Sequence, residues 1–313
     1  MRNPRQERAS TTTWVIDPTS NSTGFFDEHP RFVETSQTGP WLERLNARYL
    51  ALIHANREII RGASVLDLAS HDGRFTFAAL DAGARRVVGI EHKAELIRTS
   101  YENMAHCGAP RDAYDFVEGD IFDHITEVER CDVVFCFGLL YHINDHMLLF
   151  SKIAEIEPRF LIIDTKLSKM DGAVVEIRSP LGGSPPTRGS QVEGHPTKAA
   201  LEAMLWSFGW TFEYFDWRGS GMTELEHMND YRAGSRVSLV VECNEEVYAP
   251  EVRERAVQRV FSLQESRRMQ WLVIMDVAEQ LGLSPQKLRV WVREAERAAS
   301  RARLSGSRVP RPG

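Results

Sequence analysis

From residue 64 to residue 243, short apolar segments alternate with longer segments whose apolar residues recur at helical spacing. The short segments, which predict strands, lie at residues 64–69, 86–91, 114–118, 132–137, 159–164, 210–217 and 235–243. The segments with helical spacing lie at residues 74–82, 94–106, 146–156 and 197–208. This alternation predicts an α/β fold, in which a mainly parallel sheet carries helices on both faces.

Three further segments refine this pattern. Residues 132–137 and 159–164 are almost entirely apolar, as expected for strands that are covered on both faces. Residues 41–60 carry apolar positions at helical spacing and predict one amphipathic helix that covers the sheet. Residues 166–196 break the rhythm with Gly-Gly and Pro-Pro pairs, so we expect a long loop there that forms a lid or a substrate wall.

The last part of the chain has a different pattern, with helices predicted at 251–263, 271–281 and 285–298. Ser284 is the expected N-cap of the last helix, because Pro285 follows it at the first helical position. Two helices around a short glycine turn, the second rich in basic residues, predict a helix-turn-helix that binds DNA. The residues expected near DNA are Lys287, Arg289 and Arg293, with Gln286 and Ser284 at the helix N-terminus. A unit used only for packing or dimerisation would have the same pattern.

The charge is divided unevenly between these two parts. The net charge of −6 combines +6 over residues 250–313 with −12 over the rest of the chain, which indicates two modules with different partners. The polar segments 1–22 and 301–313 predict disordered tails, which leaves an α/β domain at 23–244 and a small all-α domain at 250–300.

The composition indicates the cellular location of the protein and the state of its cysteines. No segment approaches the roughly 20 apolar residues of a membrane span, so we expect a cytoplasmic protein without a membrane partner. The four cysteines form no C-x-x-C pair, which favours reduced packing cysteines over a zinc site or a disulfide framework.

The candidate chemistry begins at Val65-Leu-Asp-Leu-Ala-Ser-His-Asp-Gly73, an apolar run that ends in an acidic residue and passes through small residues into a helix. A strand, a tight turn and a helix N-terminus bind one end of a nucleotide-like cofactor. Glu91 ends the next strand about 20 residues further on, where a carboxylate can accept hydrogen bonds from ribose hydroxyls. Ala69 and His71 replace the first two glycines of the dinucleotide motif. The pattern therefore favours S-adenosylmethionine, which has no pyrophosphate, over NAD.

Through this motif and Glu91, the segment from residue 65 to residue 164 resembles the class I S-adenosylmethionine-dependent methyltransferases. The motifs Val117-Glu-Gly-Asp120 and Phe137-Gly-Leu-Leu-Tyr-His142 also match. The second motif resembles a branch that contains the tRNA wobble-uridine carboxymethyltransferases and several actinobacterial sugar O-methyltransferases. The segment Phe25-Phe-Asp-Glu-His-Pro-Arg31 is similar to the mycobacterial methylmannose O-methyltransferases.

A separate resemblance concerns residues 250–297, which are similar to the N-terminal helix-turn-helix of insertion-sequence transposases of the OrfA type. The matching residues are Val257, Trp271, Val277, Ala278, Leu281, Gly282, Ser284, Leu288, Arg289, Trp291, Val292 and Arg293. No transposase catalytic domain follows, so transposition itself is not implied.

The methyltransferase resemblance implies a Rossmann-like fold and an S-adenosylmethionine site. The implied cofactor-binding residues are Asp67, Ala69, Ser70, His71, Gly73, Glu91, Asp120, Ile121 and Phe137. In this assignment the turn lies against the methionine end, Glu91 holds the ribose, Asp120 contacts the adenine amino group and Ile121 packs on the ring. For His71, a hydrogen bond to the cofactor carboxylate and a turn cap are both open.

His142 is the candidate general base. It follows the fourth strand at its carboxyl end, where ligands bind in open α/β sheets, and histidine titrates near neutral pH. Tyr141 would line the same pocket, whereas a capping or core role for His142 is the alternative. Glu28 and His29 are expected to contact the acceptor, although the same residues suit a surface turn. His146 is expected on the surface.

A magnesium ion is a second candidate cofactor, because some sugar O-methyltransferases use Mg²⁺. Asp164, Asp145 and Glu176 could supply the oxygen ligands that this ion prefers. Their spacing is not specific, so we assign no residue to a metal site.

Together these features predict an S-adenosylmethionine-dependent methyltransferase that acts on a hydroxyl of a sugar or small metabolite. The alternative is a nucleic-acid methyltransferase, on tRNA or DNA, that the C-terminal helix-turn-helix delivers to its target. Against it, Phe137-Gly-Leu-Leu stands in place of the adenine-methylating motif, and the acidic body disfavours close phosphate contact. A third hypothesis is a non-catalytic DNA-binding regulator that uses the cofactor fold as a sensor. DNA and a second copy of the chain are further candidate partners.

Overall fold

A computed structural model describes most of the chain. It covers residues 24–39, 41–179, 192–243, 250–264, 270–281 and, near the end, residues 288, 289, 291–293, 295, 296 and 298. The predicted tails at 1–22 and 301–313 and the predicted turn at 282–284 lie outside the described residues.

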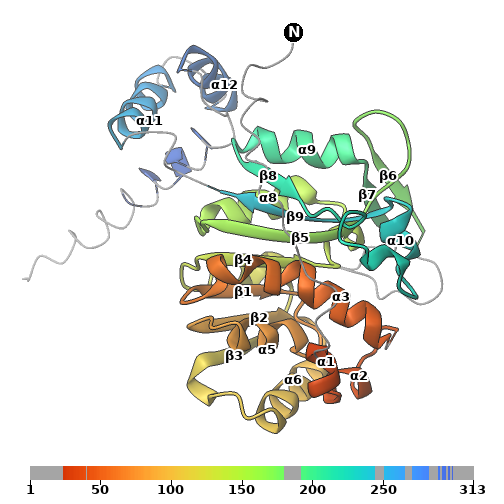
Figure 1. The fold of residues 1–313 in the computed structure, drawn as a ribbon. Coiled ribbons are helices and arrows are strands. Elements are labelled where there is room, and N and C mark those ends of the chain that lie inside the picture. The colour runs from red at the N-terminus through yellow and green to blue at the C-terminus, as the bar shows by residue number, and fades with distance from the viewer. Residues whose placement is uncertain are drawn as a thin grey trace, which may run out of the picture.

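Seven strands of the described chain form one sheet (Figure 1). They are β1 (Ser64–Leu68), β2 (Arg86–Glu91), β3 (Tyr114–Glu118), β4 (Val133–Phe137), β5 (Phe160–Lys166), β8 (Thr211–Tyr214) and β9 (Arg236–Glu242). Their order is β3-β2-β1-β4-β5-β9-β8, with β1 to β5 parallel and β9 antiparallel to both of its neighbours. The predicted strands and the mainly parallel, Rossmann-like sheet are confirmed. The order reverses between β1 and β4, and ligands of open α/β sheets bind beside such a reversal, at the carboxyl ends of the strands.

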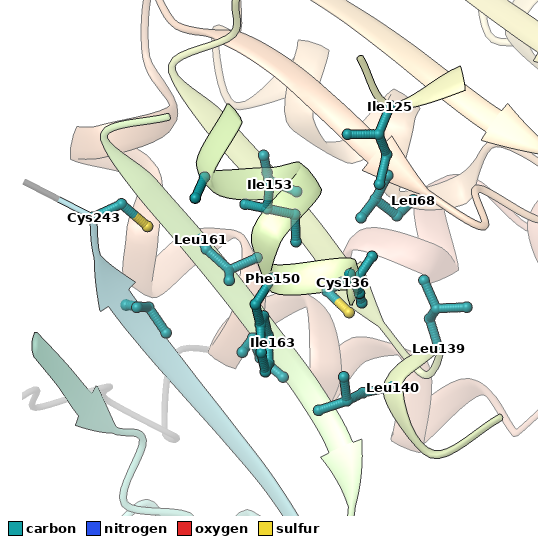
Figure 2. Close-up of a cluster of buried hydrophobic side chains, with 14 of the residues drawn as sticks. Leu68, Ile125, Cys136, Leu139, Leu140, Phe150, Ile153, Leu161, Ile163 and Cys243 are labelled. Carbon is teal, nitrogen blue, oxygen red and sulfur yellow. The ribbon is translucent and has the colours of Figure 1, made fainter. Parts of the chain in front are cut away.

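One face of the sheet is covered by α7 (Ile121–His124), α8 (His146–Glu155) and α9 (Lys198–Ser207). Figure 2 shows Phe150 and Ile153 of α8 beside Leu161 and Ile163 of β5, in a cluster of fully buried apolar side chains. Burying one such side chain contributes about 1.5–3 kcal/mol. This cluster therefore fixes the side of the sheet that lies away from the N-terminal helices.

The opposite face is covered by α3 (Leu42–Leu52), α4 (Arg57–Ile60), α5 (Arg74–Asp81) and α6 (Ala94–His106). The single helix predicted at 41–60 is wrong, because the 3₁₀ turn η2 (His54–Asn56) divides it into α3 and α4. The buried Asn56 side chain donates to the carbonyl oxygens of Ala51 and Leu52 at 3.1 and 2.9 Å. These bonds satisfy carbonyls that the end of a helix leaves free. Apolar spacing continues through the break, so the pattern does not reveal it.

Several short elements complete the described domain and gather at the carboxyl ends of the strands or between the larger elements. They are α1 (Phe25–Glu28), α2 (Arg31–Glu34), η3 (Arg111–Ala113), η4 (Leu140–His142), η5 (Met222–Glu224) and α10 (Asn229–Arg232).

A two-stranded antiparallel sheet lies within the segment predicted as a loop. It pairs β6 (Val175–Arg178) with β7 (Glu193–Pro196), so the loop prediction is wrong for these residues. Strands of four residues show too little alternation to stand out beside glycines and prolines. Thr197 then begins α9, where its hydroxyl accepts a hydrogen bond from the Ala200 N–H at 3.1 Å.

The end of the described chain contains α11 (Pro250–Gln264) and α12 (Gln270–Leu281), close to two of the predicted helices. Their apolar side chains form a core of their own with Leu288, Trp291 and Val292. This small core agrees with a separate helical unit, while the helix-turn-helix itself and the predicted domain boundaries stay predictions.

The most heavily bonded side chain within the sheet is Asp164, at the carboxyl end of β5. Arg236 of β9 contacts its Oδ1 through both Nε, at 2.8 Å, and Nη2, and Arg48 of α3 lies 3.2 Å from the same oxygen. The hydroxyls of Tyr231 and Ser238 donate to Oδ2 at 2.7 and 2.8 Å. Burial alone would raise the pKa of Asp164, but Arg236 and Arg48 hold it well below its usual range.

We expect Asp164→Ala to lower the free energy of unfolding by about 3–5 kcal/mol, because it leaves the buried guanidinium of Arg236 and the partly buried one of Arg48 without their counter-charge. Urea unfolding followed by circular dichroism measures the change, and the exposed Asp171→Ala is the control. A loss no larger than that of the control would show that the cluster does not stabilise the fold. Since the native pKa is lowered, the contribution of Asp164 is present at neutral pH and is lost as the pH falls below the usual aspartate range.

Candidate functional site

The turn after β1 has an unusual backbone. Ala69, His71 and Gly73 all adopt positive φ angles, of 56°, 56° and 80°. Residues other than glycine seldom adopt this conformation, and such strain is often held at functional sites. At Gly73 a side chain would also approach Phe116 and Ser100 to 3.2 Å. The turn thus packs closely against β3 and α6.

Glu91, at the end of β2, is tied directly to this turn. The carboxylate is buried, and its Oε2 accepts a hydrogen bond from the backbone N–H of His71 at 3.1 Å. Its Oε1 accepts from the N–H groups of His92 and Lys93 at 3.0 and 3.1 Å. The two parts of the site that the sequence predicted separately, the turn and the strand-end carboxylate, therefore lie in direct contact.

Asp67 lies on β1 just before the turn and is fully enclosed. Its Oδ2 accepts a hydrogen bond from the Thr76 hydroxyl at 2.8 Å. Burial raises the pKa of Asp67 to about 7, and the nearby carboxylates of Glu91 and Asp72 act in the same direction. Asp67 therefore links β1 to α5 through Thr76, and its carboxyl group changes charge near neutral pH.

Asp72 is a structural residue of the turn to which the sequence assigned no role. Arg74 forms a two-pronged ion pair with it at 2.6 and 2.8 Å, and the Thr35 hydroxyl donates to its Oδ2 at 2.9 Å. The Asn103 amide of α6 donates to the Asp72 backbone carbonyl at 3.0 Å. Elements before and after the turn thus hold it in one conformation. An aspartate followed two residues later by an arginine was the only signal in the sequence.

Asp120, Ile121 and Phe137 lie where the next strands end. Asp120 caps α7 by accepting the Phe122 N–H at 2.8 Å, and Ile121 is buried in the adjoining core. Phe137 stacks on Phe135 with ring centroids 4.7 Å apart, so its ring packs in the core beside α5. The structure gives these three residues packing and capping partners, and their contact with a cofactor stays a prediction. Ser70 is buried at the turn, and its contact with a cofactor also stays a prediction.

His142 ends η4, just after β4, and its side chain is 27% exposed. Its Nδ1 lies 3.0 Å from Oε1 of Glu193 on β7, and the other oxygen of Glu193 lies 2.9 Å from Nε2 of His195. Burial lowers the pKa of His142, against the opposing effect of Glu193. His142 is therefore neutral at neutral pH and able to accept a proton. Sequence reasoning missed Glu193 and His195, because both lie in the segment predicted as a loop.

Two more side chains lie around His142. The Tyr141 ring is 4.1 Å from the His142 ring, and the Lys166 ammonium lies 4.8 Å above the Tyr141 ring. Tyr141 was predicted to line the pocket of His142, and the two rings are in contact. His146, predicted on the surface, is instead buried, with Nε2 2.9 Å from the carbonyl oxygen of Leu140. This bond ties the start of α8 to η4.

Part of the chain that forms this site matches a known protein family. Residues 65–156 match the sequence profile of a family described as "Methyltransferase domain". This segment is a methyltransferase domain. It includes the turn, Glu91, Asp120 and His142, but not β7 with Glu193.

Curated relatives match only part of the chain. A Methanocaldococcus jannaschii protein, provisionally named as a ribosomal RNA large subunit methyltransferase, is 30% identical over 106 residues, which are 33% of this chain and 26% of that protein. The chain thus spans about a quarter of the length of this relative. An uncharacterised 12 kDa protein of the insertion element IS629 from Shigella flexneri is 44% identical over 50 residues, which are 16% of this chain and 46% of that protein.

Solved structures with a similar chain path are more distant in sequence. The N-terminal domain of EvdMO1, crystallised in the presence of SAH and D-fucose, has 22% identity and a TM-score of 0.46, covering 60% of this chain and 78% of that one. An S-adenosylmethionine-dependent methyltransferase from Mesorhizobium loti has 16% identity and a TM-score of 0.46, covering 63% of this chain and 97% of that one. At these scores neither likeness assigns an activity to this chain.

Glu28 is the last residue of α1, and His29 follows it directly. Glu28 is exposed at the end of α1, and the His29 ring packs edge-on against Phe77 of α5 with centroids 4.8 Å apart. No described contact joins either residue to His142 or Glu193. Their predicted contact with the acceptor stays a prediction.

The candidate magnesium ligands are not brought together. The carboxylate of Asp164 is occupied by two arginines and two hydroxyls, and Glu176 accepts hydrogen bonds from Arg178 and Ser168. Asp145 is exposed at the start of α8. Within the described ranges, no group of three His, Cys, Asp or Glu side chains could hold a metal ion. The structure therefore does not support a Mg²⁺ site built from these three residues.

Part of the predicted DNA-binding face can be located. Ser284, Gln286 and Lys287 lie outside the described residues. Arg293 points instead toward the methyltransferase domain, with Nη1 3.4 Å from Oε1 of Glu155 at the end of α8. DNA binding by this face stays a prediction. None of the described helices is long and apolar enough to cross a membrane.

The raised pKa of Asp67 predicts how stability depends on pH. A carboxyl group with a raised native pKa binds its proton more tightly in the folded state, so its contribution is present at low pH and is lost as the pH rises toward about 7. We expect Asp67→Asn to remove this contribution, so that between about pH 4 and pH 7 wild type loses stability relative to the variant. Urea unfolding at several pH values measures the difference, with the exposed Asp123→Asn as control. Parallel pH curves for wild type and Asp67→Asn would contradict the assignment.

Proposed function

We propose that the protein transfers a methyl group from S-adenosylmethionine to a hydroxyl group of a sugar or small metabolite. The observation that carries this proposal is a neutral histidine, His142, that a carboxylate orients beside the strained turn of a methyltransferase domain. Both features lie at the carboxyl ends of β1 and β4, where the strand order reverses.

The donor set suits S-adenosylmethionine. This cofactor needs a hydrogen-bond acceptor for two ribose hydroxyls, backbone groups for its amino-acid end and an apolar surface for adenine. Glu91, the backbone of the turn at residues 69–73, and Ile121 offer these three kinds of surface. The cofactor also carries positive charge on sulfur and nitrogen, which agrees with three carboxyl groups, of Asp67, Asp72 and Glu91, around one turn.

Methyl transfer to a hydroxyl requires that the protein align the donor with the acceptor and remove the proton of the hydroxyl. S-adenosylmethionine supplies a methyl group on a sulfonium, which departs as a neutral thioether. The turn and Glu91 hold the donor in place, and a fixed donor lets the acceptor approach in line. His142 accepts the proton of the acceptor hydroxyl, and Glu193 stabilises the imidazolium that results.

A second candidate is methylation of RNA, which the name of the Methanocaldococcus relative favours. The net charge of −12 over residues 1–249 disfavours a close approach of phosphates to the methyltransferase domain. The likeness to an insertion-element protein supports the predicted helix-turn-helix, through which DNA could be bound by residues 250–298.

Radiolabelled methyl transfer to a panel of sugars, small hydroxy metabolites and total tRNA and rRNA distinguishes the two candidates. Label found only in RNA would overturn the proposal.

We expect Glu91→Gln to weaken binding of S-adenosylhomocysteine by about tenfold or more, since hydrogen bonds to a charged group are worth about 1.5–3 kcal/mol. Isothermal titration calorimetry measures the Kd. Glu118→Gln is a matched control, because Glu118 is the register partner of Glu91 on β3 and is exposed. Equal affinities of the two variants would remove Glu91 from the cofactor site, and no binding by wild type would remove the proposal as a whole.

We expect His142→Gln to lower kcat by about 10²–10⁴ while the Kd for S-adenosylhomocysteine stays unchanged, because general-base catalysis contributes a factor of this size. His106→Gln, at an exposed histidine on α6, is the control. Since the pKa of His142 is lowered, wild-type kcat should rise with pH to a plateau, with the midpoint of the rise below the usual histidine pKa. Full activity of His142→Gln would show that another group takes the proton.

A further inference from the structure

The small sheet of β6 and β7 carries a chain of polar side chains that ends at His142. Arg178 of β6 lies between Glu176, whose Oε2 it contacts at 2.6 Å, and His195, whose Nδ1 lies 3.4 Å from its Nη1. His195 in turn contacts Glu193, and Glu193 contacts His142. No part of this chain falls within the matched methyltransferase segment at residues 65–156, except His142 itself.

The bonding pattern determines which ring nitrogens carry protons. Arginine only donates hydrogen bonds, so Nδ1 of His195 accepts from Arg178 and Nε2 of His195 carries the proton that is donated to Glu193. The ionised carboxylate of Glu193 only accepts, so Nδ1 of His142 must also carry a proton. In a neutral imidazole this leaves the lone pair on Nε2 of His142.

The contact between β7 and η4 is unusually close. A Cβ atom on Gly194 would lie 2.5 Å from the carbonyl oxygen of Ile143, a separation that real side chains do not reach. The Asn144 amide also donates to the Val192 carbonyl oxygen at 3.3 Å. Glycine at position 194 therefore lets β7 approach until Glu193 reaches His142.

We propose that Glu193 is a positioning residue, which the β6–β7 hairpin places so that His142 is held in the Nδ1–H form with Nε2 available to the acceptor hydroxyl. The catalytic part of this proposal rests on the proposed function. His195 and Arg178 act one step further away, since they fix the orientation of the Glu193 carboxylate. A side chain outside the methyltransferase segment thus completes its candidate base.

The charged groups around His142 predict a distinctive pH effect. Burial lowers the pKa of His142 most, Lys166 of β5 and Arg236 of β9 also lower it, and Glu193 alone among the principal groups raises it. Removing the charge of Glu193 should therefore shift the acidic limb of kcat to lower pH. It should also lower kcat, because the imidazolium formed during proton transfer loses its counter-charge.

The first experiment is ¹⁵N NMR of the full-length protein with labelled histidine, in which His142→Gln assigns the His142 signals. We expect the Nδ1–H form of His142 in wild type and a mixture of both forms in Glu193→Gln. Glu127→Gln is a matched control, because His124 Nδ1 contacts Glu127 at 2.7 Å in an exposed pair. It should alter the His124 signals and leave those of His142 unchanged. The Nε2–H form in wild type, or identical His142 signals in Glu193→Gln, would overturn the proposal.

The second experiment measures kcat and KM against pH for wild type, Glu193→Gln and Glu193→Asp. We expect Glu193→Gln to lower kcat by about 10²–10⁴ with a shifted acidic limb and an unchanged Kd for S-adenosylhomocysteine. Glu193→Asp keeps the charge, so it should keep the position of the limb and recover part of kcat. An unshifted limb in Glu193→Gln would mean that the residue has only a structural role.

Gly194→Ala provides an independent variant that leaves the carboxylate in place. It should move β7 away from η4 and reproduce the mixed His142 signals without removing any charge. Unchanged His142 signals in a folded Gly194→Ala protein would contradict the proposed positioning by the hairpin. Absence of methyl transfer to any acceptor would refute the proposed function, whereas the NMR signals would still test the placement of His142 by Glu193.

Discussion

The buried carboxylate of Asp164 is the constraint on which the arrangement of the site depends. It lies at the carboxyl end of β5, and its partners come from three other elements: Arg48 from α3, Tyr231 from α10, and Arg236 and Ser238 from β9. A buried charge must be paired, so these elements cannot move independently of the sheet. Arg44 of α3 adds a two-pronged ion pair with Asp230, which fixes α3 to α10 as well. The N-terminal helices, the last strand and the walls of the site are thereby joined at one point.

The cofactor side of the site is built from local strain held by distant contacts. Ala69 and His71 adopt positive φ angles on either side of Ser70, and Glu91 of β2 and Ser100 of α6 hydrogen-bond to the backbone of His71. Arg74 and Thr35 hold Asp72 in the same turn. Strained backbone persists only where its surroundings determine it, and here four elements do so. A turn fixed in advance loses little freedom when a ligand binds.

The acceptor side is built differently, from polar side chains carried by a hairpin that follows the last parallel strand. Glu193 reaches His142 because Gly194 allows β7 to contact the backbone of η4. The helical unit at the end of the described chain lies apart from this region (Figure 1). Its Arg293 and Arg253 contact Glu155 and Glu157 at the end of α8 and in the residues that follow it, which is the opposite end of that helix from the site. The acidic end of α8 thus contacts the basic helical unit, in agreement with the opposite net charges of the two parts of the sequence.

The sequence alone determined the sheet, the turn after β1, and the acidic ends of β1 and β2, because these features depend on local apolar periodicity and on short-range spacing. His142 could be selected for the same reason, since it directly follows a buried strand. Only the tertiary structure decided which side chains surround it. Glu193 and His195 lie about 50 residues further on, in a strand too short to show a pattern. Asp164 is paired with two arginines because α3, from before the sheet, and β9, its last strand in sequence, both pack beside β5. Contacts between distant segments are set by packing and charge pairing, which no local pattern records.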